Sequence, residues 1–167
     1  YAALLQQPGD TTRQRAFFDA FPRSFFELEV IFGYKPDLIP SNLYTEGHNY
    51  STAFWTRLPA VPLDQRADRL IDLLTGGEWE ADMPSYLKSE LKAFADKEPL
   101  ALFRLLSRRP QPVQRLFWQC YWQNPNNDPW LAAALSHYKK AAARKYPRET
   151  AVMMSAYRDF AGTLEGR

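Results

Sequence analysis

The sequence predicts an all-α domain, an irregular bundle of eight or nine helices packed in layers around one core. Three observations predict it. Apolar residues recur every three or four positions along most of the chain. Most of the 13 prolines stand where these runs begin or end, and only 7 glycines are available for turns or flexible linkers. Because no internal repeat or domain boundary is visible, we expect residues 1–167 to form a single domain.

The composition fits a soluble globular domain. A chain of 167 residues can bury a sizeable core without a disulfide or a metal. Hydrophobic residues make up 46% of it, which argues against disorder over most of its length. The single cysteine, Cys120, excludes an intramolecular disulfide. No apolar run approaches the roughly 18 residues of a membrane span.

The chain should open with a loose lead-in, residues 1–9. Asp10 is a good N-cap for a first helix that runs to about Phe21, where Pro22 ends it. The residues expected to be buried in that helix are Ala16, Phe17 and either Ala20 or Phe21.

A second helix should begin at Ser24, whose S-x-x-E spacing to Glu27 is that of a capping box. Gly33 stands where a C-terminal glycine belongs. Alternating apolar residues from 28 to 34 also allow a strand, but the start and stop signals favour the helix. The apolar residues at helical spacing are Phe25, Leu28, Ile31 and Phe32.

Residues 34–42 read as a loop, and a third helix is expected from about Leu43 to Leu58, although Gly47 weakens it. Residues 63–74 are the clearest amphipathic helix, and Gly76-Gly77 should stop it. Its apolar stripe consists of Leu63, Ala67, Leu70, Ile71 and Leu74.

The second half should hold five more helices, each introduced by a proline or a capping aspartate. The first is capped by Asp82 and buries Leu87, Leu91 and Phe94. A short helix after Pro99 carries Leu102, Phe103 and Leu106.

The next helix starts at Pro110 and Pro112 and carries Val113, Leu116, Phe117 and Cys120. A helix capped by Asp128 follows the turn 124–128, has Pro129 as its first residue and runs to about Tyr146. The last helix follows Pro147 and carries Val152, Ala156, Phe160 and Leu164.

Aromatic residues are concentrated in segment 117–130, where Phe117, Trp118, Tyr121 and Trp122 cover nearly half of a helix circumference. Either this helix is central and buried on most sides, which we favour, or some rings face a ligand or partner. Another tryptophan in a glycine-rich loop either anchors that loop or presents a contact surface. The candidate aromatic binding residues are Trp79, Trp118, Trp122 and Trp130.

The charge is divided between the halves of the chain. Residues 1–98 hold 10 Lys and Arg against 15 Asp and Glu, a net −5, whereas residues 99–167 hold 11 against 4, a net +7. The two halves either attract each other within the fold, which we favour, or steer an acidic partner. No nucleic-acid motif is present, so binding of an anion or nucleic acid is the minority interpretation. Its candidate residues are Arg108, Arg109, Lys140 and Arg144, with Arg148 extending them.

Residues for catalysis or metal binding are few. Glu46 and His48 are spaced for a general-base or metal site, and Glu78, Glu80 and Asp82 in the acidic loop 78–82 are suited to a hard cation. Structural roles are favoured, because neither set belongs to a known metal motif. Nucleotide-loop, serine-hydrolase and zinc motifs are absent too, so no metal or cofactor is expected.

Three stretches, Phe21-Pro22-Arg23-Ser24-Phe25-Phe26-Glu27-Leu28, residues 76–82 and Phe117-Trp118, resemble segments of uncharacterised, all-helical proteins of Bacteroidetes-type bacteria. Those proteins often carry signal peptides. The resemblance implies an exported bacterial protein of unknown role and no catalytic residues. Because the chain begins at Tyr1 and not at Met, we expect a processed or trimmed N-terminus, and favour a periplasmic or secreted location over the cytoplasm.

The sequence therefore predicts a small helical binding or interaction protein without catalytic activity, whose partner is another protein and whose oligomeric state is open. The alternative is a hydrolase-type enzyme that uses Glu46, His48 and the acidic loop 78–82. The third hypothesis is anion or nucleic-acid binding through the basic C-terminal half. The leading hypothesis predicts that tryptophan rings are exposed near a groove.

Overall fold

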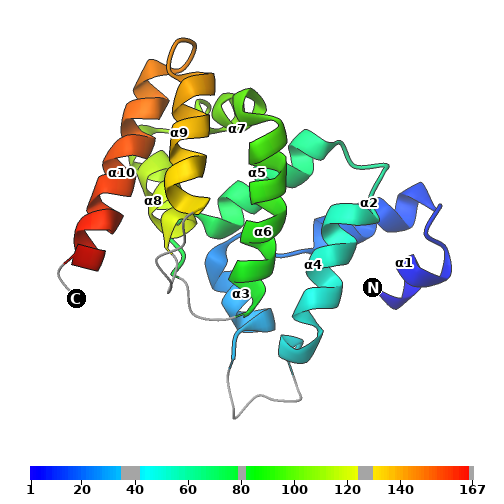
Figure 1. Ribbon diagram of the computed structural model, residues 1–167. Coiled ribbons are helices and arrows are strands. Elements are labelled where there is room, and N and C mark those ends of the chain that lie inside the picture. Colours follow the sequence, from blue (N-terminus) through cyan, green and yellow to red (C-terminus); the bar gives the residue numbers. More distant parts are fainter. Residues whose placement is uncertain (35–41, 79–81, 124–129, 166–167) are drawn as a thin grey trace.

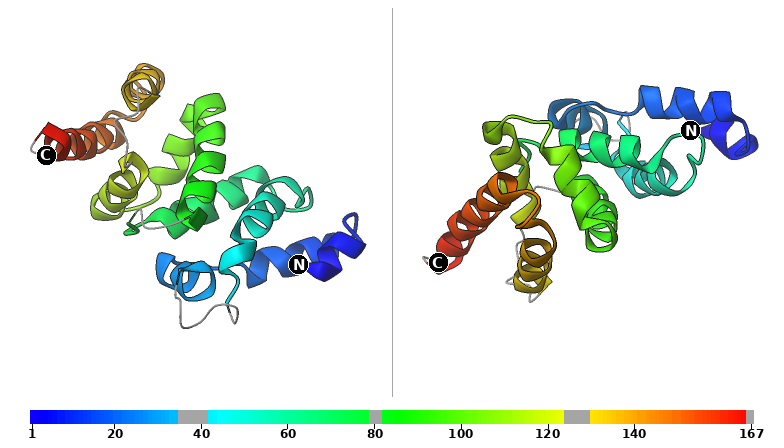
Figure 2. Two further views of the ribbon diagram at one scale, coloured as in Figure 1. Left: turned by 60° about the horizontal axis from the view of Figure 1, so that its bottom comes forward. Right: turned by 90° about the horizontal axis from the view of Figure 1, so that it is seen from above.

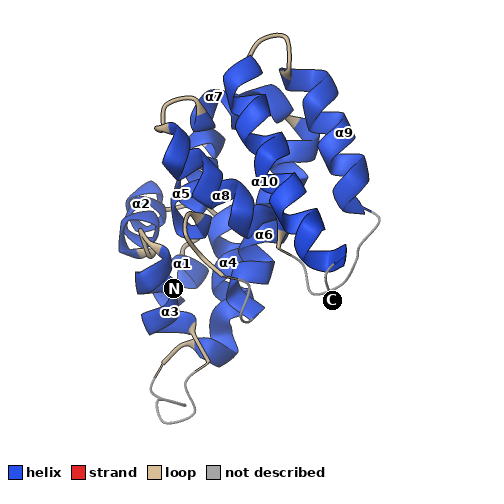
Figure 3. Ribbon diagram, turned by 90° about the vertical axis from the view of Figure 1, so that its left-hand side faces the viewer, coloured by secondary structure: helices blue, strands red, loops and turns tan. Residues whose placement is uncertain are grey.

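The computed structural model describes residues 1–34, 42–78, 82–123 and 130–165 (Figure 1). This part of the chain is helical, without a strand, and the predicted all-α class is confirmed (Figure 3). The helices are α1 (Ala2–Gln6), α2 (Thr11–Ala20), α3 (Phe25–Phe32), the 3₁₀ turn η2 (Tyr44–Glu46), α4 (Gly47–Thr56), α5 (Leu63–Leu74), α6 (Asp82–Lys97), α7 (Pro99–Leu106), α8 (Gln111–Trp122), α9 (Trp130–Ala142) and α10 (Pro147–Glu165).

The predicted loose lead-in is wrong, because it contains the short helix α1. Leu4 is 1% exposed and belongs to the core, so burial of this residue holds the segment in place. Burial of Phe17 is confirmed, and of the two alternatives Ala20 and Phe21 it is Phe21 that is buried. The prediction for Ala16 is wrong, because Ala16 is exposed and Gln14 takes the other inward position of α2.

The two N-caps at the start of the chain are confirmed. The Asp10 carboxylate accepts hydrogen bonds from the backbone N–H groups of Thr12 and Arg13. The Ser24 hydroxyl accepts from the Glu27 N–H at 3.2 Å. The Glu27 carboxylate returns to the N–H of Arg23, at 2.7 Å, one residue earlier than in a standard capping box. The backbone N–H groups of Arg23 and Glu27 are therefore both hydrogen-bonded to side chains at the start of α3.

Glycine positions correct two further expectations. Gly47 does not weaken a long helix; it is the first residue of α4, buried where an added Cβ would lie 3.4 Å from the Met83 sulfur. Gly33 ends α3 with φ −67°, not in the left-handed conformation. A Cβ at Gly33 would lie 2.4 Å from the Glu29 carbonyl oxygen, so lack of space explains the glycine there.

Helix α5 has the predicted bounds, and the helix after Pro99 is found as α7. In α8 the predicted burial of Phe117 and Cys120 is confirmed, but that of Leu116 is wrong, because Leu116 is 44% exposed while Trp118 and Trp122 turn inward. Helix α9 ends at Ala142 and not near Tyr146. The turn 124–128 with its Asp128 cap, Pro129, and the side chain of Leu164 lie outside the described residues.

The helices form an elongated bundle. Helices α9 and α10 lie at one end and α1 and α2 at the other, with α5 and α6 between them (Figures 1 and 2). Helix α8 packs against α10 and α5, whereas α3 lies at the edge of the bundle (Figures 1 and 3). Within the described residues, no helix combines the length and the apolar character that a membrane crossing requires.

Candidate functional site

The predicted aromatic site is mostly core. Trp118 and Trp122 are 0% exposed, so the alternative that their rings face a partner is wrong and central burial is confirmed. Their rings stack at 5.3 Å and contact α7, α9 and α10. Trp130 is half-buried, and Trp79 lies outside the described residues. The tryptophans of α8 therefore serve packing, because helices cover them on most sides.

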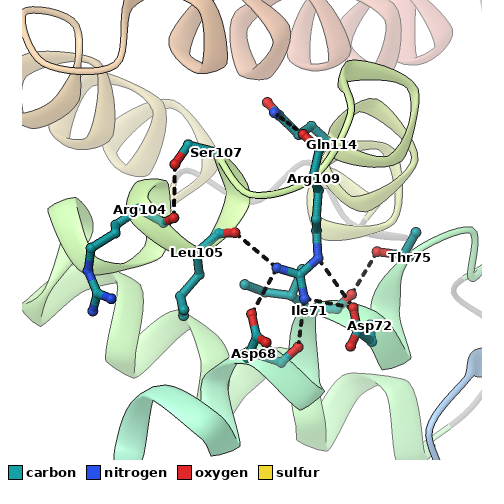
Figure 4. Close-up of polar contacts among 9 residues, drawn as sticks. All are labelled: Asp68, Ile71, Asp72, Thr75, Arg104, Leu105, Ser107, Arg109 and Gln114. Atoms are coloured by element: carbon teal, nitrogen blue, oxygen red, sulfur yellow. Dashed lines mark hydrogen bonds and ion pairs between the residues drawn. The ribbon is translucent and has the colours of Figure 1, made fainter.

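Arg109, predicted as an anion ligand, is held by two aspartates of α5 (Figure 4). Its guanidinium donates to the Asp68 carboxylate at 2.8 Å and to the Asp72 carboxylate at 2.7 Å, and its side chain is only 12% exposed. It also donates to the carbonyls of Leu105 and Asp68. These contacts tie α5 to the turn between α7 and α8, so Arg109 is a structural cation in this fold.

The other predicted basic residues are exposed. Arg108 lies in the turn before α8 and Lys140 on α9. Arg144 follows the end of α9, so it does not share a helical face with Lys140 although the two are four residues apart. Arg148 lies on α10, in a hollow of about 580 Å³ that it shares with Arg115 of α8. Arg115 there pairs with Asp159 at 2.5 Å, so one of its two arginines is already neutralised.

Glu46 and His48 have separate partners. The Glu46 carboxylate accepts from the Asn49 amide at 2.9 Å. His48 is exposed, and its ring packs edge-on against Tyr86 of α6 at 5.0 Å. Burial raises the pKa of Glu90 on α6, and the charge of His48 partly offsets this effect. The proposed Glu46–His48 pair is therefore not joined by any contact that the structure gives.

Glu78 and Asp82, the two residues of the acidic loop that the structure describes, lie next to different helices. Glu78 lines a hollow of about 320 Å³ together with Gln119 of α8 and Asp159 of α10. Asp82, the first residue of α6, accepts a hydrogen bond from the Tyr44 hydroxyl at 3.1 Å. Glu80 lies outside the described residues. Within the described residues, no three His, Cys, Asp or Glu side chains form a group that could hold a metal ion.

Cys120 is unsuited to nucleophilic chemistry. It is 2% exposed, and burial raises the pKa of its thiol to about 11, an effect that the ammonium of Lys88 partly opposes. Lys88 is itself buried and donates to the Gln123 carbonyl. The thiolate is the reactive form of cysteine, so a raised pKa keeps this side chain inert near neutral pH.

One exposed surface was missed by sequence reasoning. Phe26 is 76% exposed, Val30 is 45% exposed and Tyr34 is 60% exposed. Phe26 and Val30 are four residues apart on α3 and share its outer side, and Tyr34 follows just beyond the end of the helix, after the extended Gly33. We name Phe26, Val30 and Tyr34 the α3 outer face. The signal was present in the sequence, because α3 carries apolar residues all around its circumference.

The opposite side of α3 is anchored in the fold. Leu28 and Phe32 are buried in the core. Phe25 packs so closely on the turn after α5 that a Cβ at Gly77 would lie 2.4 Å from its ring. At the C-terminal end, the Tyr34 ring packs edge-on against Tyr44 at 5.1 Å. The α3 outer face is thus presented on a helix fixed by packing on its inner side.

No protein-family model matches this sequence, and no curated protein or solved structure is significantly similar to it. The resemblance to exported, all-helical bacterial proteins therefore stays a prediction. Among the large hydrophobic side chains that the structure describes, Phe26 and Tyr34 of the α3 outer face are the most exposed.

Proposed function

We propose that this chain is a protein-binding module and that the α3 outer face is its contact surface. The observation that carries the proposal is the 76% exposure of Phe26. Burying such a side chain is worth about 1.5–3 kcal/mol, which a partner that covers it would gain. Single exposed apolar residues need no explanation, but two on one side of a helix and a third just past its end are typical of a contact surface.

The charges around this face suit a basic partner. Glu27 is exposed on α3 beside Phe26. At the other end, Tyr34 contacts Tyr44, whose hydroxyl is bonded to Asp82. Residues 1–98, the part of the chain that includes α3, carry a net charge of −5. We therefore propose that the partner is an amphipathic segment of another protein, with basic side chains bordering its apolar ones.

A site-specific cross-link tests the surface. A photoreactive amino acid replaces Phe26 in the full chain, and in a control it replaces Leu100, which is 41% exposed on α7, away from α3. After irradiation in the source cells, the cross-linked peptide is sequenced by mass spectrometry. The proposal expects one partner segment, rich in Lys or Arg and apolar residues, from position 26 alone. Equal products from both positions, or no product, would overturn it, and so would a cross-link to a second copy of this chain.

Binding of that sequenced segment, made as a peptide, then measures the contribution of the surface. Phe26→Glu should weaken binding by about 2 kcal/mol, roughly thirtyfold in Kd, because the anchor becomes a charge. Leu100→Glu, a matched apolar-to-acidic change, should leave Kd unaltered. Added salt should weaken binding to the unaltered chain, because opposite charges border the contact. Equal affinities of the two variants would refute the assignment of the α3 outer face.

A further inference from the structure

The C-terminal half encloses a cluster of four aromatic rings, each within 6.4 Å of the other three. Trp118 and Trp122 stack with ring centroids 5.3 Å apart and planes 15° from parallel. Tyr121 lies 5.3 Å from Trp118 and 5.2 Å from Trp122, and Tyr138 lies 6.3 Å from both tryptophans. All four side chains are 0% exposed. At these separations electrons pass readily between neighbouring rings.

A chain of hydrogen bonds leads from this cluster to the surface. The Tyr138 hydroxyl donates to the Asp96 carboxylate at 2.8 Å. Because that uses its only hydrogen, the 2.8 Å bond between the two phenols must be donated by Tyr121 to Tyr138. The Asp96 side chain is 40% exposed and pairs with Lys92 at 2.5 Å. The Tyr138 proton therefore has a carboxylate acceptor that reaches solvent.

The indole N–H groups of the two tryptophans differ from the Tyr138 hydroxyl in this respect. Among the described residues, the indole N–H groups of Trp118 and Trp122 are buried without a hydrogen-bond partner. An indole that loses an electron becomes a radical cation, and it is neutralised only if its N–H proton can leave. With no acceptor, the radical cation keeps its proton and remains a strong oxidant. A buried orphan donor is rare enough to need a reason, and redox chemistry is one such reason.

The cluster also reaches the surface through aromatic rings. Trp130 is half-buried and lies 6.3 Å from Tyr121. Tyr157 is half-buried and packs edge-on against Trp122 at 5.3 Å. These two rings lie at the rim of the cluster, so an oxidant in solution can take an electron through either of them.

We propose that this cluster is a one-electron relay that carries oxidising equivalents out of the tryptophan core to Tyr138. A one-electron oxidant, such as a diffusing radical, removes an electron from the cluster and leaves a tryptophan radical cation at Trp118 or Trp122. Tyr138 then gives that indole an electron and gives its phenolic proton to the Asp96 carboxylate. The products are a neutral indole, a neutral tyrosyl radical and a protonated Asp96.

A soluble reductant of the thiol or ascorbate class closes the cycle. It returns one electron to the tyrosyl radical, and Asp96 returns the proton to the phenolate oxygen. Charge, electrons and protons therefore balance over the two steps, and the tryptophans are spared irreversible oxidation. This activity does not depend on the α3 outer face or on its partner.

Flash photolysis tests the relay in the full chain. Photo-oxidised ruthenium tris-bipyridine serves as the oxidant, and optical and electron paramagnetic resonance spectra distinguish tryptophan from tyrosyl radicals. The tryptophan radical should decay as a tyrosyl radical grows, and more slowly in D₂O because a proton moves. In Tyr138→Phe the tryptophan radical should live severalfold longer. Tyr86→Phe, which removes a phenol outside the cluster, should leave its lifetime unchanged.

Asp96→Asn is the second variant, because it keeps every aromatic ring and removes only the proton acceptor. It should also prolong the tryptophan radical severalfold and abolish the D₂O effect. After steady illumination, peptide mapping should find severalfold more oxidised Trp118 and Trp122 in both variants. If the radical lifetime is the same in the unaltered chain, Tyr138→Phe and Asp96→Asn, the relay is refuted and the cluster is packing alone.

Discussion

Helices α3 and α8 share a sequence pattern but have opposite surroundings. Both carry apolar residues around most of their circumference. Helix α8 turns its tryptophans inward, with Trp118 and Trp122 at 0% exposure, while Leu116 on its outer side is 44% exposed. Helix α3 lies at the edge of the bundle (Figure 1), and its Phe26 is 76% exposed. An all-round apolar helix is typical of a core, so the exposed one is the more informative about function.

Truncating one large ring on each helix is the most direct test of this comparison. Trp118→Ala should lower the free energy of unfolding by about 3–5 kcal/mol, because it leaves a cavity among packed rings. Phe26→Ala should change it by less than about 0.5 kcal/mol, because no described side chain packs over the lost ring. Urea denaturation followed by far-UV circular dichroism measures both. A similar loss in the two variants would mean that the α3 outer face is part of the core.

Tyr138→Phe should have the next largest effect, and it also changes the pH dependence. Losing the hydroxyl leaves the Tyr121 donor without its partner in the core, which costs about 1–3 kcal/mol. Burial raises the pKa of both tyrosines above the ordinary value of 10.0. The unfolded chain therefore loses these protons first, and stability falls as the pH rises above about 10.

Replacing Tyr138 removes one of these two groups, so the unfolding free energy should fall less steeply above about pH 10 in Tyr138→Phe than in the unaltered chain. Denaturation curves recorded from neutral to alkaline pH give this slope. Parallel slopes would show that Tyr138 ionises equally in the folded and unfolded chains.

Arg109 offers a smaller test, because it fixes the turn through which the chain enters α8. Arg109→Met should lower the free energy of unfolding by about 2 kcal/mol, because it removes the cation that pairs with Asp68 and Asp72. The loss is no larger because water reaches both carboxylates, which are partly exposed. Arg104→Met is the matched control. Its pair with Asp64 is exposed on both sides, so its loss should leave the free energy of unfolding almost unchanged. Equal costs in thermal unfolding would contradict the structural role given to Arg109.

Local signals account for what the sequence predicted correctly. The cap at Asp10, the amphipathic stripe of residues 63–74 and Pro99 each act within a few residues, and the helices they predict are present. Helix α1 with Leu4 was missed because five residues are too few to show helical periodicity. The boundary of α9 was missed because 3.6-residue periodicity continues past Ala142.

The candidate site depended on long-range contacts and was predicted less well. Arg109 and Asp68 are 41 positions apart, so nothing local distinguishes this cation from a free one. The same holds for the aromatic residues. Trp118 and Phe26 both lie on apolar helices, and only the packing of the other helices decides which ring is covered. Periodicity predicts which residues share a side of a helix, but it does not predict which of those sides other helices cover.

The last substitution tests what keeps α3 helical although one of its sides is exposed to solvent. An exposed helix of eight residues depends on its cap more than an enclosed one does. Ser24→Ala removes the hydroxyl that accepts from the Glu27 N–H, and should cost about 1 kcal/mol. Helix α8 has Pro110 as its N-cap, without a side-chain cap bond, so Gln111→Ala should cost little. Amide hydrogen exchange should therefore speed up in α3 for Ser24→Ala and stay slow in α8 for Gln111→Ala. Unchanged exchange in α3 would mean that inner-side packing by Leu28 and Phe32 holds this helix without its cap.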